Sequence, residues 1–245
     1  MKAMILAAGL GTRLRPLTET IPKALIEVNG RPILEIIILR LKKYGFKDII
    51  INVHHYHQQI LDFLTSHDNF GINIQISDET ERVLDTGGGI KKASWFLDGS
   101  EPFLVHNVDV ISDIDLKEIY DYHYQRKPLV TLAVKDKDSA RCLLFDKSNR
   151  LCGWENRDTG ESKIIGNPDE KEMARIGFCG IHVIDPLIFK YMGVKEKFSI
   201  ITTYMNAAAD QIITGYPVEE NLWIDIGSFR QLEHAQSIAP DLYLN

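Results

Sequence analysis

The residues that most clearly suggest chemistry lie in a glycine-containing loop near the N-terminus. Gly9 and Gly11 follow a short apolar run, and Thr12, Arg13 and Lys23 come after them. Glycines allow a backbone to approach a ligand closely and to expose several N–H groups within one concavity. Basic side chains around such a turn can bind phosphate oxygens with charge-assisted hydrogen bonds. The pattern therefore predicts a pocket for a polyphosphate.

Two familiar phosphate-binding motifs do not fit this loop. A dinucleotide-binding turn requires a third glycine where this chain has Leu14. A Walker-type loop requires a Gly-Lys-Ser/Thr string, which the sequence lacks. A glycine-rich turn alone would favour an ordinary strand–turn–helix connection with solvated basic residues. The composite string Gly-x-Gly-Thr-Arg-x-x-Pro-x-Thr, which begins at Gly9 and is followed by Pro22 and Lys23, is more specific.

This composite string resembles the signature of the sugar-phosphate nucleotidyltransferases, also called NDP-sugar pyrophosphorylases. The resemblance implies transfer of a nucleoside monophosphate from a nucleoside triphosphate to a sugar 1-phosphate, with release of pyrophosphate. The attacking phosphate oxygen is already ionised, so the enzyme must align two anions and neutralise charge at the α-phosphorus. We therefore expect Arg13 and Lys23 to be catalytic. The residues implied to bind the nucleotide here are Ala7, Ala8, Gly9, Gly11, Thr12 and Arg13.

Two aspartates are candidate ligands of Mg²⁺. Asp109 ends an apolar strand, and strand ends of this kind face the ligand crevice in open α/β sheets, although an isolated aspartate there often caps the next helix. Asp225 lies in Trp-Ile-Asp-Ile-Gly-Ser, which is similar to the family's Trp-x-Asp-x-Gly-Thr, and Ser228 is better placed to cap the last helix. The resemblance implies that both carboxylates hold Mg²⁺ against the triphosphate. Many relatives carry glycine where this chain has Val108.

A second glycine-rich segment precedes an expected helix over residues 88–96. A helix N-terminus of this kind can approach a nucleobase or ribose closely, and the alternative is a simple loop cap. Family members use this loop for the nucleobase, and the Thr-Gly-Gly-Gly string resembles the short uridylyl- and guanylyltransferase branch. The residues expected to bind the nucleotide here are Asp85, Thr86, Gly87 and Gly88.

The expected sugar side departs from the family pattern. Relatives often carry a Glu-Lys-Pro string whose lysine binds the sugar phosphate, whereas this chain has Glu-Asn-Arg. The resemblance implies sugar-phosphate contacts from Asn107, Glu155 and Gly177. The residues that could replace the missing lysine are Arg157, Lys163 and Arg175, and the sequence does not choose among them.

Composition limits the classes of partner. The 245 residues carry a net charge of −6, which opposes binding to nucleic acid or to an anionic membrane. The three cysteines are scattered and odd in number, as expected of reduced thiols in a cytoplasmic protein. We expect neither a signal peptide nor a membrane span. The expected partners are a nucleoside triphosphate and a sugar 1-phosphate, for a monomer or small homo-oligomer.

Strand and helix patterns alternate through the first half of the chain. The expected strands are 2–7, 47–53, 72–77, 103–107 and 129–134, and the expected helices are 32–44, 56–65, 88–96 and 115–126. This rhythm predicts an α/β fold with a doubly wound, mostly parallel sheet. The resemblance identifies it as a Rossmann-like sheet of the GT-A type.

The second half changes character. Its expected elements are a hairpin of 141–145 and 151–154, strands 174–184, 211–217 and 222–225, a short helix opened by Pro186, and helices 200–209 and 228–238. They predict a small α+β subdomain, and the family resemblance implies that this region binds the sugar phosphate. We expect a single domain over 1–245, with a nucleotide-binding half (1–135), a sugar-phosphate-binding half (136–245) and no C-terminal β-helix.

The sequence leaves the base and the acceptor open. The expected reaction joins UTP to N-acetylmuramate 1-phosphate, with mannose- or heptose-1-phosphate guanylyl transfer as the alternative. A phosphocholine cytidylyltransferase is similar at the N-terminus and would need an aromatic cage, which Trp154 could help to form. A non-catalytic nucleotide-binding subunit is the remaining alternative.

Overall fold

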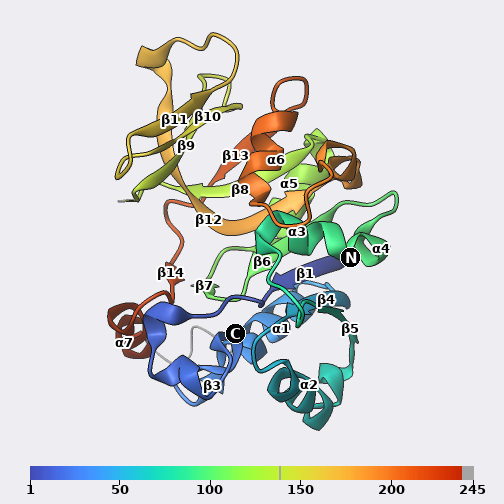
Figure 1. The fold of residues 1–245 in the computed structure, drawn as a ribbon. Coiled ribbons are helices and arrows are strands. Elements are labelled where there is room, and N and C mark those ends of the chain that lie inside the picture. The colour runs from blue at the N-terminus through green and yellow to red at the C-terminus, as the bar shows by residue number, and fades with distance from the viewer. Residues whose placement is uncertain (138, 239–245) are drawn as a thin grey trace.

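The computed structural model describes residues 1–137 and 139–238, so position 138 and residues 239–245 of the expected second half lie outside the described part. Figure 1 shows a central sheet with helices packed against it. The first half supplies four parallel strands in the order β6-β1-β4-β5. Their bounds are β1 (Lys2–Leu6), β4 (Asp48–Val53), β5 (Asn73–Asp78) and β6 (Phe103–Asn107). This parallel sheet confirms the expected fold class.

Helices cover both faces of this sheet. Ala3 and Ile5 of β1 belong to one apolar core, and Met4 between them belongs to the other. Successive side chains of a strand point to opposite faces, so β1 is buried on both sides. The first core takes side chains from α1 (Ile33–Lys43), α2 (His57–Ser66), α5 (Leu116–Arg126) and α7 (Phe229–Ser237). The second takes side chains from α3 (Asp85–Lys92), α4 (Ser94–Leu97) and α6 (Ile200–Ala207).

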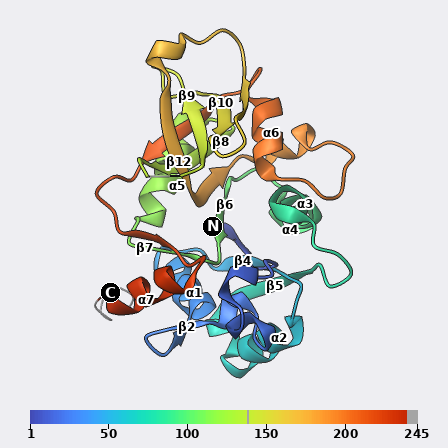
Figure 2. The same cartoon turned by 60° about the vertical axis from the view of Figure 1, so that its left-hand side comes forward.

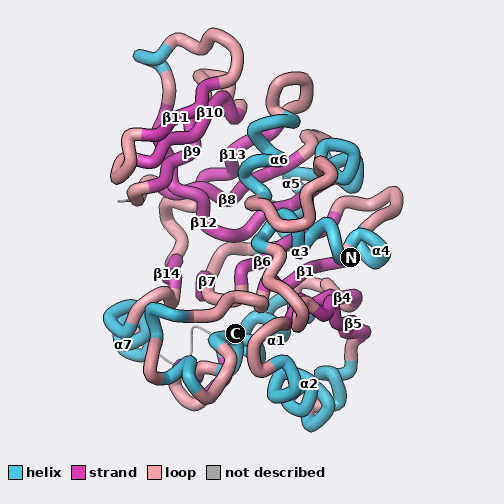
Figure 3. Tube along the Cα trace, viewed as in Figure 1, coloured by secondary structure: helices cyan, strands magenta, loops and turns pink. Residues whose placement is uncertain are grey.

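The second half extends the sheet with mainly antiparallel strands. Their bounds are β8 (Val130–Lys135), β9 (Arg141–Phe145), β10 (Leu151–Asn156), β11 (Glu161–Ile164), β12 (Ala174–Ile184) and β13 (Ile213–Pro217). The long strand β12 pairs with β9 near its start and with β6 and β8 further on, so it joins the two groups of strands seen in Figures 2 and 3. The expected β9–β10 hairpin is confirmed. The sequence did not predict β11, because its four residues are all exposed and form a strand only by pairing with the edge of β10.

Short elements complete the chain. Two small antiparallel pairs join β2 (Glu27–Val28) to β3 (Arg31–Pro32) and β7 (Val110–Ser112) to β14 (Trp223–Asp225). The 3₁₀ turns are η1 (Thr12–Leu14), η2 (Leu17–Glu19), η3 (Lys23–Leu25), η4 (Asp68–Gly71), η5 (Glu170–Glu172) and η6 (Pro186–Tyr191). A helix needs about 20 apolar residues to cross a bilayer. No helix within the described ranges is long and apolar enough to do so.

The helix expected over 88–96 has different bounds. Helix α3 begins at Asp85 and ends at Lys92, and the separate turn α4 follows it. The triple glycine therefore lies inside the helix rather than before it. Glycine is a poor helix former, so the sequence favoured a loop here. Tertiary contacts reverse that preference, because the N–H groups of Gly87 and Gly88 both donate to the carbonyl of Phe198, at 2.9 and 3.2 Å.

Three buried histidines predict how stability depends on pH. Burial lowers the pKa of His106 and His123 to about 4 and that of His182 to about 3. These imidazoles stay neutral in the folded protein and take up protons on unfolding below about pH 6.5. Their contribution to stability is therefore complete above pH 6.5 and is lost as the pH falls toward 4. Urea unfolding between pH 8 and pH 4.5 should show this decline.

The variant His182→Gln separates this contribution from general acid denaturation. It should lower the free energy of unfolding at pH 8, because the hydrogen bond of 2.8 Å between His182 Nδ1 and the Tyr204 hydroxyl is lost. Its decline below pH 6.5 should be shallower than that of the wild type. An unchanged slope would rule out His182 as a source of the pH dependence.

Candidate functional site

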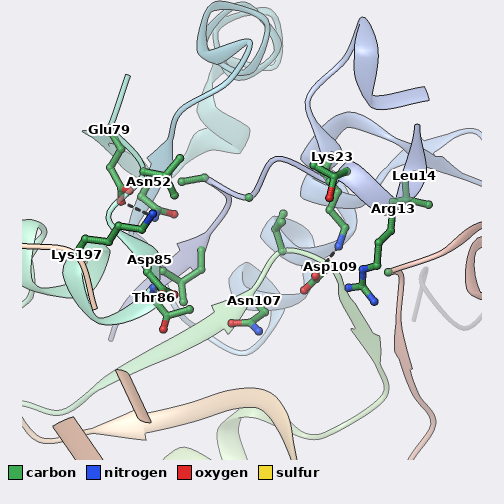
Figure 4. A pocket seen from close by; sticks show the side chains of 18 residues that line it. Arg13, Leu14, Lys23, Asn52, Glu79, Asp85, Thr86, Asn107, Asp109 and Lys197 are labelled. Carbon is green, nitrogen blue, oxygen red and sulfur yellow. Dashed lines mark hydrogen bonds and ion pairs between the residues drawn. The ribbon is translucent and has the colours of Figure 1, made fainter. Parts of the chain in front are cut away.

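A pocket of about 500 Å³ opens at the carboxyl ends of the parallel strands. Its lining includes Ala8 after β1, Asn52 in β4, Glu79 after β5 and Asn107 at the end of β6. Strand β1 has β4 on one side and β6 on the other, which is the point in the strand order where open α/β sheets bind ligands. We call it the strand-end pocket. Figure 4 shows one group of charged side chains around Lys23 and Asp109 and another around Glu79.

Both expected catalytic cations, Arg13 and Lys23, lie at the end of the pocket that contains Asp109. Lys23 belongs to η3, is buried, and places its Nζ 2.5 Å from Asp109 Oδ2. Arg13 belongs to η1 and lies against Gly227, since a Cβ on that glycine would be 2.7 Å from a guanidinium nitrogen. The structure therefore brings Arg13 and Lys23 together around Asp109, as Figure 4 shows.

Strand pairing brings the second aspartate to the same end. Asp225 in β14 lies opposite Val110 of β7, and the N–H of Ile226 donates to the carbonyl of Asp109 at 2.8 Å. Burial raises the pKa of the Asp225 carboxyl, and so does the charge of Asp109, while Lys23, Arg13 and Lys137 oppose the rise. Within the described part of the chain, Asp225 Oδ1 is buried and has no hydrogen-bond partner. It is the kind of group that a ligand or ion satisfies.

Neither aspartate is used to cap a helix. Asp115 caps α5, where its carboxylate accepts hydrogen bonds from Lys117 and Glu118. Ser228 caps α7, so the expectation that it rather than Asp225 fills this role is confirmed. The capping alternative for Asp109 is wrong, because its carboxylate is directed to Lys23 instead.

The two aspartates fit the Mg²⁺ that the family resemblance implies. A buried carboxylate oxygen without a protein partner lies near a second carboxylate, and Mg²⁺ takes oxygen ligands. Across residues 1–137 and 139–238 no group of three or more His, Cys, Asp or Glu side chains forms a metal cluster. Two carboxylates would leave most of an octahedral shell to phosphate oxygens and water, which is usual for Mg²⁺ at nucleotide sites.

The N-terminal glycines have different roles. Gly11 has φ +62°, and a Cβ there would lie 2.8 Å from Thr18 Cγ2 and 3.2 Å from Lys23 Cβ, so it allows close packing beneath the loop. Gly9 lines the strand-end pocket, and a Cβ on it would meet nothing within 4 Å. Open space beside a glycine in a pocket is what a closely approaching ligand requires. Thr12 also lines the pocket, whereas Ala7 holds the loop by donating to Asn52 Oδ1 at 2.6 Å.

Sequence reasoning missed a buried polar pair at the other end of the pocket. Asn52 and Glu79 are 3% and 1% exposed, and Asn52 Nδ2 donates to Glu79 Oε1 at 2.7 Å. The backbone N–H of Leu84 donates to the second carboxylate oxygen at 2.9 Å. Each oxygen of the buried carboxylate is therefore paired, and Glu79 fixes the segment that leads into α3. The available signal was a polar residue at or just beyond the end of an apolar strand.

The residues expected to bind the nucleobase have two different roles, lining of the pocket and packing against another segment of the chain. Asp85 and Thr86 line the strand-end pocket, but Gly87 and Gly88 are not part of its lining. A Cβ on Gly87 would lie 2.4 Å from the Phe198 ring, and one on Gly88 would lie 2.1 Å from the carbonyl oxygen of Glu196. These two glycines therefore let the segment 193–199 pack directly on α3. Their direct contact with a nucleotide remains a prediction.

The expected sugar-side residues are spread over a wider area. Asn107 lines the strand-end pocket, whereas Glu155 and Gly177 lie outside its lining. Glu155 accepts from the Nε atoms of Arg157 and Arg175, at 3.3 and 3.2 Å. Two of the three candidates for the missing lysine therefore already pair with the same carboxylate.

A further cation on this side was not predicted. Lys137 crosses Gly177, where a Cβ would lie 2.4 Å from Lys137 Cε. Its Nζ donates to the carbonyl of Phe178 at 2.7 Å and lies 3.6 Å from the centre of the Trp223 ring. Burial lowers the pKa of Lys137, while nearby groups that include Asp225 raise it. The structure therefore adds Lys137 to the cations that could neutralise an acceptor phosphate near Asp225.

Substitution by alanine should have different effects at Gly87 and at Gly9. Gly87→Ala should cost about 1–3 kcal/mol in the free energy of unfolding, because its Cβ collides with Phe198. Gly9→Ala should change stability by less than about 0.5 kcal/mol and should weaken nucleotide binding several-fold. Urea unfolding and nucleotide titration measure the two effects. Alanine is the better helix former by about 1 kcal/mol, so a stabilised Gly87→Ala would contradict the collision.

Comparison with known proteins identifies the family of the chain. Residues 2–143 match the family model described as nucleotidyl transferase. The chain is 31% identical over 239 residues to an N-acetylmuramate alpha-1-phosphate uridylyltransferase of Neisseria meningitidis serogroup B, covering 98% of each chain. It is 30% identical to a mannose-1-phosphate guanyltransferase of Hypocrea jecorina, covering 93% of this chain and 61% of that relative.

Solved structures agree on the fold. A putative glucose-1-phosphate thymidylyltransferase from Bacillus anthracis superimposes with a TM-score of 0.81 at 20% identity, over 98% of this chain and 96% of that one. The family match covers more than half of the sequence, and the two curated relatives extend over nearly all of it. The chain therefore belongs to the nucleotidyl transferase family and is an enzyme of the sugar-phosphate nucleotidyltransferase kind.

Proposed function

We propose that the protein transfers the uridylyl group of UTP to N-acetylmuramate 1-phosphate and releases pyrophosphate. The single observation that supports transfer at this site is a charged cluster: Lys23, Arg13 and Asp109 line one end of the strand-end pocket, and Asp225 interacts with all three from beside it. The choice of substrates rests on relatives of the same length that carry this activity in their names.

The chemistry follows from the charges at this end. An oxygen of the sugar phosphate attacks the α-phosphorus of UTP, a P–O bond forms, and the bond to the β-phosphate oxygen breaks as pyrophosphate leaves. A phosphate monoester has a second pKa near 6, so the attacking oxygen needs no base at neutral pH. Lys23 is fixed by Asp109 and would neutralise charge that develops at the α-phosphate, while Arg13 would hold the outer phosphates.

Mg²⁺ is part of the proposal. Asp109 and Asp225 would hold the ion, which when bound would neutralise phosphate charge beside the α-phosphorus. Lys23 pairs with Asp109 in this structure, so its ammonium compensates part of the negative charge of the two carboxylates. Asp225 keeps a buried oxygen without a partner, which supports its role as the second ligand.

A guanylyltransferase remains the second candidate. It rests on the 30% identity to a mannose-1-phosphate guanyltransferase over 93% of this chain. The phosphocholine alternative is less favoured, because two relatives that match nearly the whole chain are named as uridylyltransferases of a sugar phosphate.

A matrix assay tests the proposal. UTP, GTP, CTP and ATP are each combined with N-acetylmuramate, mannose, glucose and heptose 1-phosphates and with phosphocholine, and released pyrophosphate is measured. UTP with N-acetylmuramate 1-phosphate should give the highest kcat/KM, a chelator should abolish turnover, and Mg²⁺ should restore it. Higher turnover of GTP with mannose 1-phosphate would transfer the assignment to the second candidate. Full activity in the chelator would remove the metal from the proposal.

Lys23 provides the sharpest test of mechanism. Lys23→Ala should lower kcat by about 10²–10³-fold, because a fixed charge at the reacting phosphate is lost. The control is Lys190→Ala, which removes an exposed lysine of η6 outside the strand-end pocket and should leave kcat unchanged. Circular dichroism should show both variants folded. Near-normal turnover of Lys23→Ala would exclude the assigned role.

A further inference from the structure

Lys197 is a cation of the strand-end pocket that the proposed reaction does not yet use. It belongs to the segment 193–199 between η6 and α6, which we call the strap. Lys197 lines the pocket, although it comes from the second half of the chain. Figure 4 places it with Glu79, Asn52 and Asp85, at the end away from Lys23. It therefore lies away from the group of charges assigned to the phosphates.

Both neighbours of Lys197 are attached to the rest of the chain, Phe198 through its backbone and Glu196 through its side chain. The N–H of Phe198 donates to the carbonyl of Leu84 at 3.2 Å, and the carbonyl of Phe198 accepts from the N–H groups of Gly87 and Gly88. Glu196 forms an ion pair with Arg82. The strap is thus attached to α3 and to the segment before it, so Lys197 is held at the mouth of the pocket by its neighbours.

Among the residues that the structure describes, no hydrogen bond or ion pair reaches the Nζ of Lys197, and the nearby carboxylate of Glu79 is already paired with Asn52 and Leu84. A lysine ammonium carries three donors and no acceptor. An unpaired donor group in a binding pocket is available for an acceptor on the ligand.

The position of Lys197 in the pocket indicates which part of the nucleotide its ammonium would contact. The triphosphate is assigned to the end with Arg13 and Lys23, so the nucleobase extends toward the end with Glu79, Asp85 and Lys197. Uracil presents two carbonyl oxygens, guanine and cytosine present one each, and adenine presents none. We propose that Lys197 is a specificity-determining residue that donates a hydrogen bond to a carbonyl oxygen of the nucleobase. This inference rests on the proposed function.

The test compares two lysines of one strap. Lys197→Met removes the ammonium at the pocket, and Lys195→Met makes the same change at an exposed neighbour outside the pocket lining. With saturating sugar phosphate, Lys197→Met should lower kcat/KM for the preferred triphosphate by about 10–100-fold and leave the slow reaction with ATP unchanged. Lys195→Met should match the wild type. The melting temperatures of all three proteins should agree.

Thiocarbonyl nucleotides make the contact explicit. Sulfur is a weak acceptor, so 2-thio-UTP or 4-thio-UTP, or 6-thio-GTP if guanosine is preferred, should be a several-fold poorer substrate for the wild type. The same analogue should bring no further loss in Lys197→Met, because the contact is already absent. An equal loss in both proteins would overturn the inference. So would a Lys197→Met defect of the same size with all four triphosphates, which would indicate a phosphate, ribose or structural role.

Failure of the inference is distinct from failure of the proposed function. If the wild type turns over no combination of triphosphate and acceptor, the proposed function fails. Calorimetric titration with the four triphosphates then still tests Lys197 by binding alone. If the wild type is active and Lys197→Met behaves as Lys195→Met does, only the inference is wrong.

Discussion

Mutual repulsion of two carboxylates is the constraint around which the catalytic end is built. The short β7–β14 pair forces Asp225 close to Asp109, and burial together with the Asp109 charge raises the pKa of the Asp225 carboxyl. Such an arrangement is stable only if positive charge is near. Lys23 supplies it at 2.5 Å from Asp109, and Arg13 adds to it from the glycine loop. Attraction between these charges therefore helps to hold the N-terminal glycine loop next to strand β14.

Glycine has two different structural roles in this protein, one in ligand access and one in close packing. Gly9 leaves open space in the pocket, where backbone can meet a ligand, whereas Gly87 and Gly88 have no space and bring the strap onto α3. Motif strings alone do not separate these cases, because both are short glycine-rich strings in the sequence. Only the atoms that a Cβ would meet distinguish a binding glycine from a packing glycine.

The sequence could predict those features that depend on the hydrophobic pattern or on the residue types of a few neighbouring positions. The alternating β1 to β6 region has long apolar runs, so its strands were found almost to the residue, and Ser228 was identified as a cap from its position alone. The helix at the triple glycine was misplaced because contacts with Phe198, distant in sequence, override low helix propensity. Lys137 and Lys197 were missed because a single lysine in a loop carries no periodic signal. Only the fold brings such a residue to a site.

The end of the pocket proposed to hold the base combines residues from both halves of the chain, which has a consequence for how such enzymes diverge. The end around Lys23 uses the N-terminal loop, Asp109 before β7 and Asp225 in β14, whereas the opposite end combines the segment 79–86 with the strap. Because the backbone of Phe198 bonds to Leu84, Gly87 and Gly88, the Lys197 side chain can change without loss of these bonds. Substitution in the strap could therefore alter the preferred base while the transfer chemistry stays intact. With the base placed as proposed, this separation would give a physical reason why relatives named as uridylyl- and guanylyltransferases are both about 30% identical to this chain.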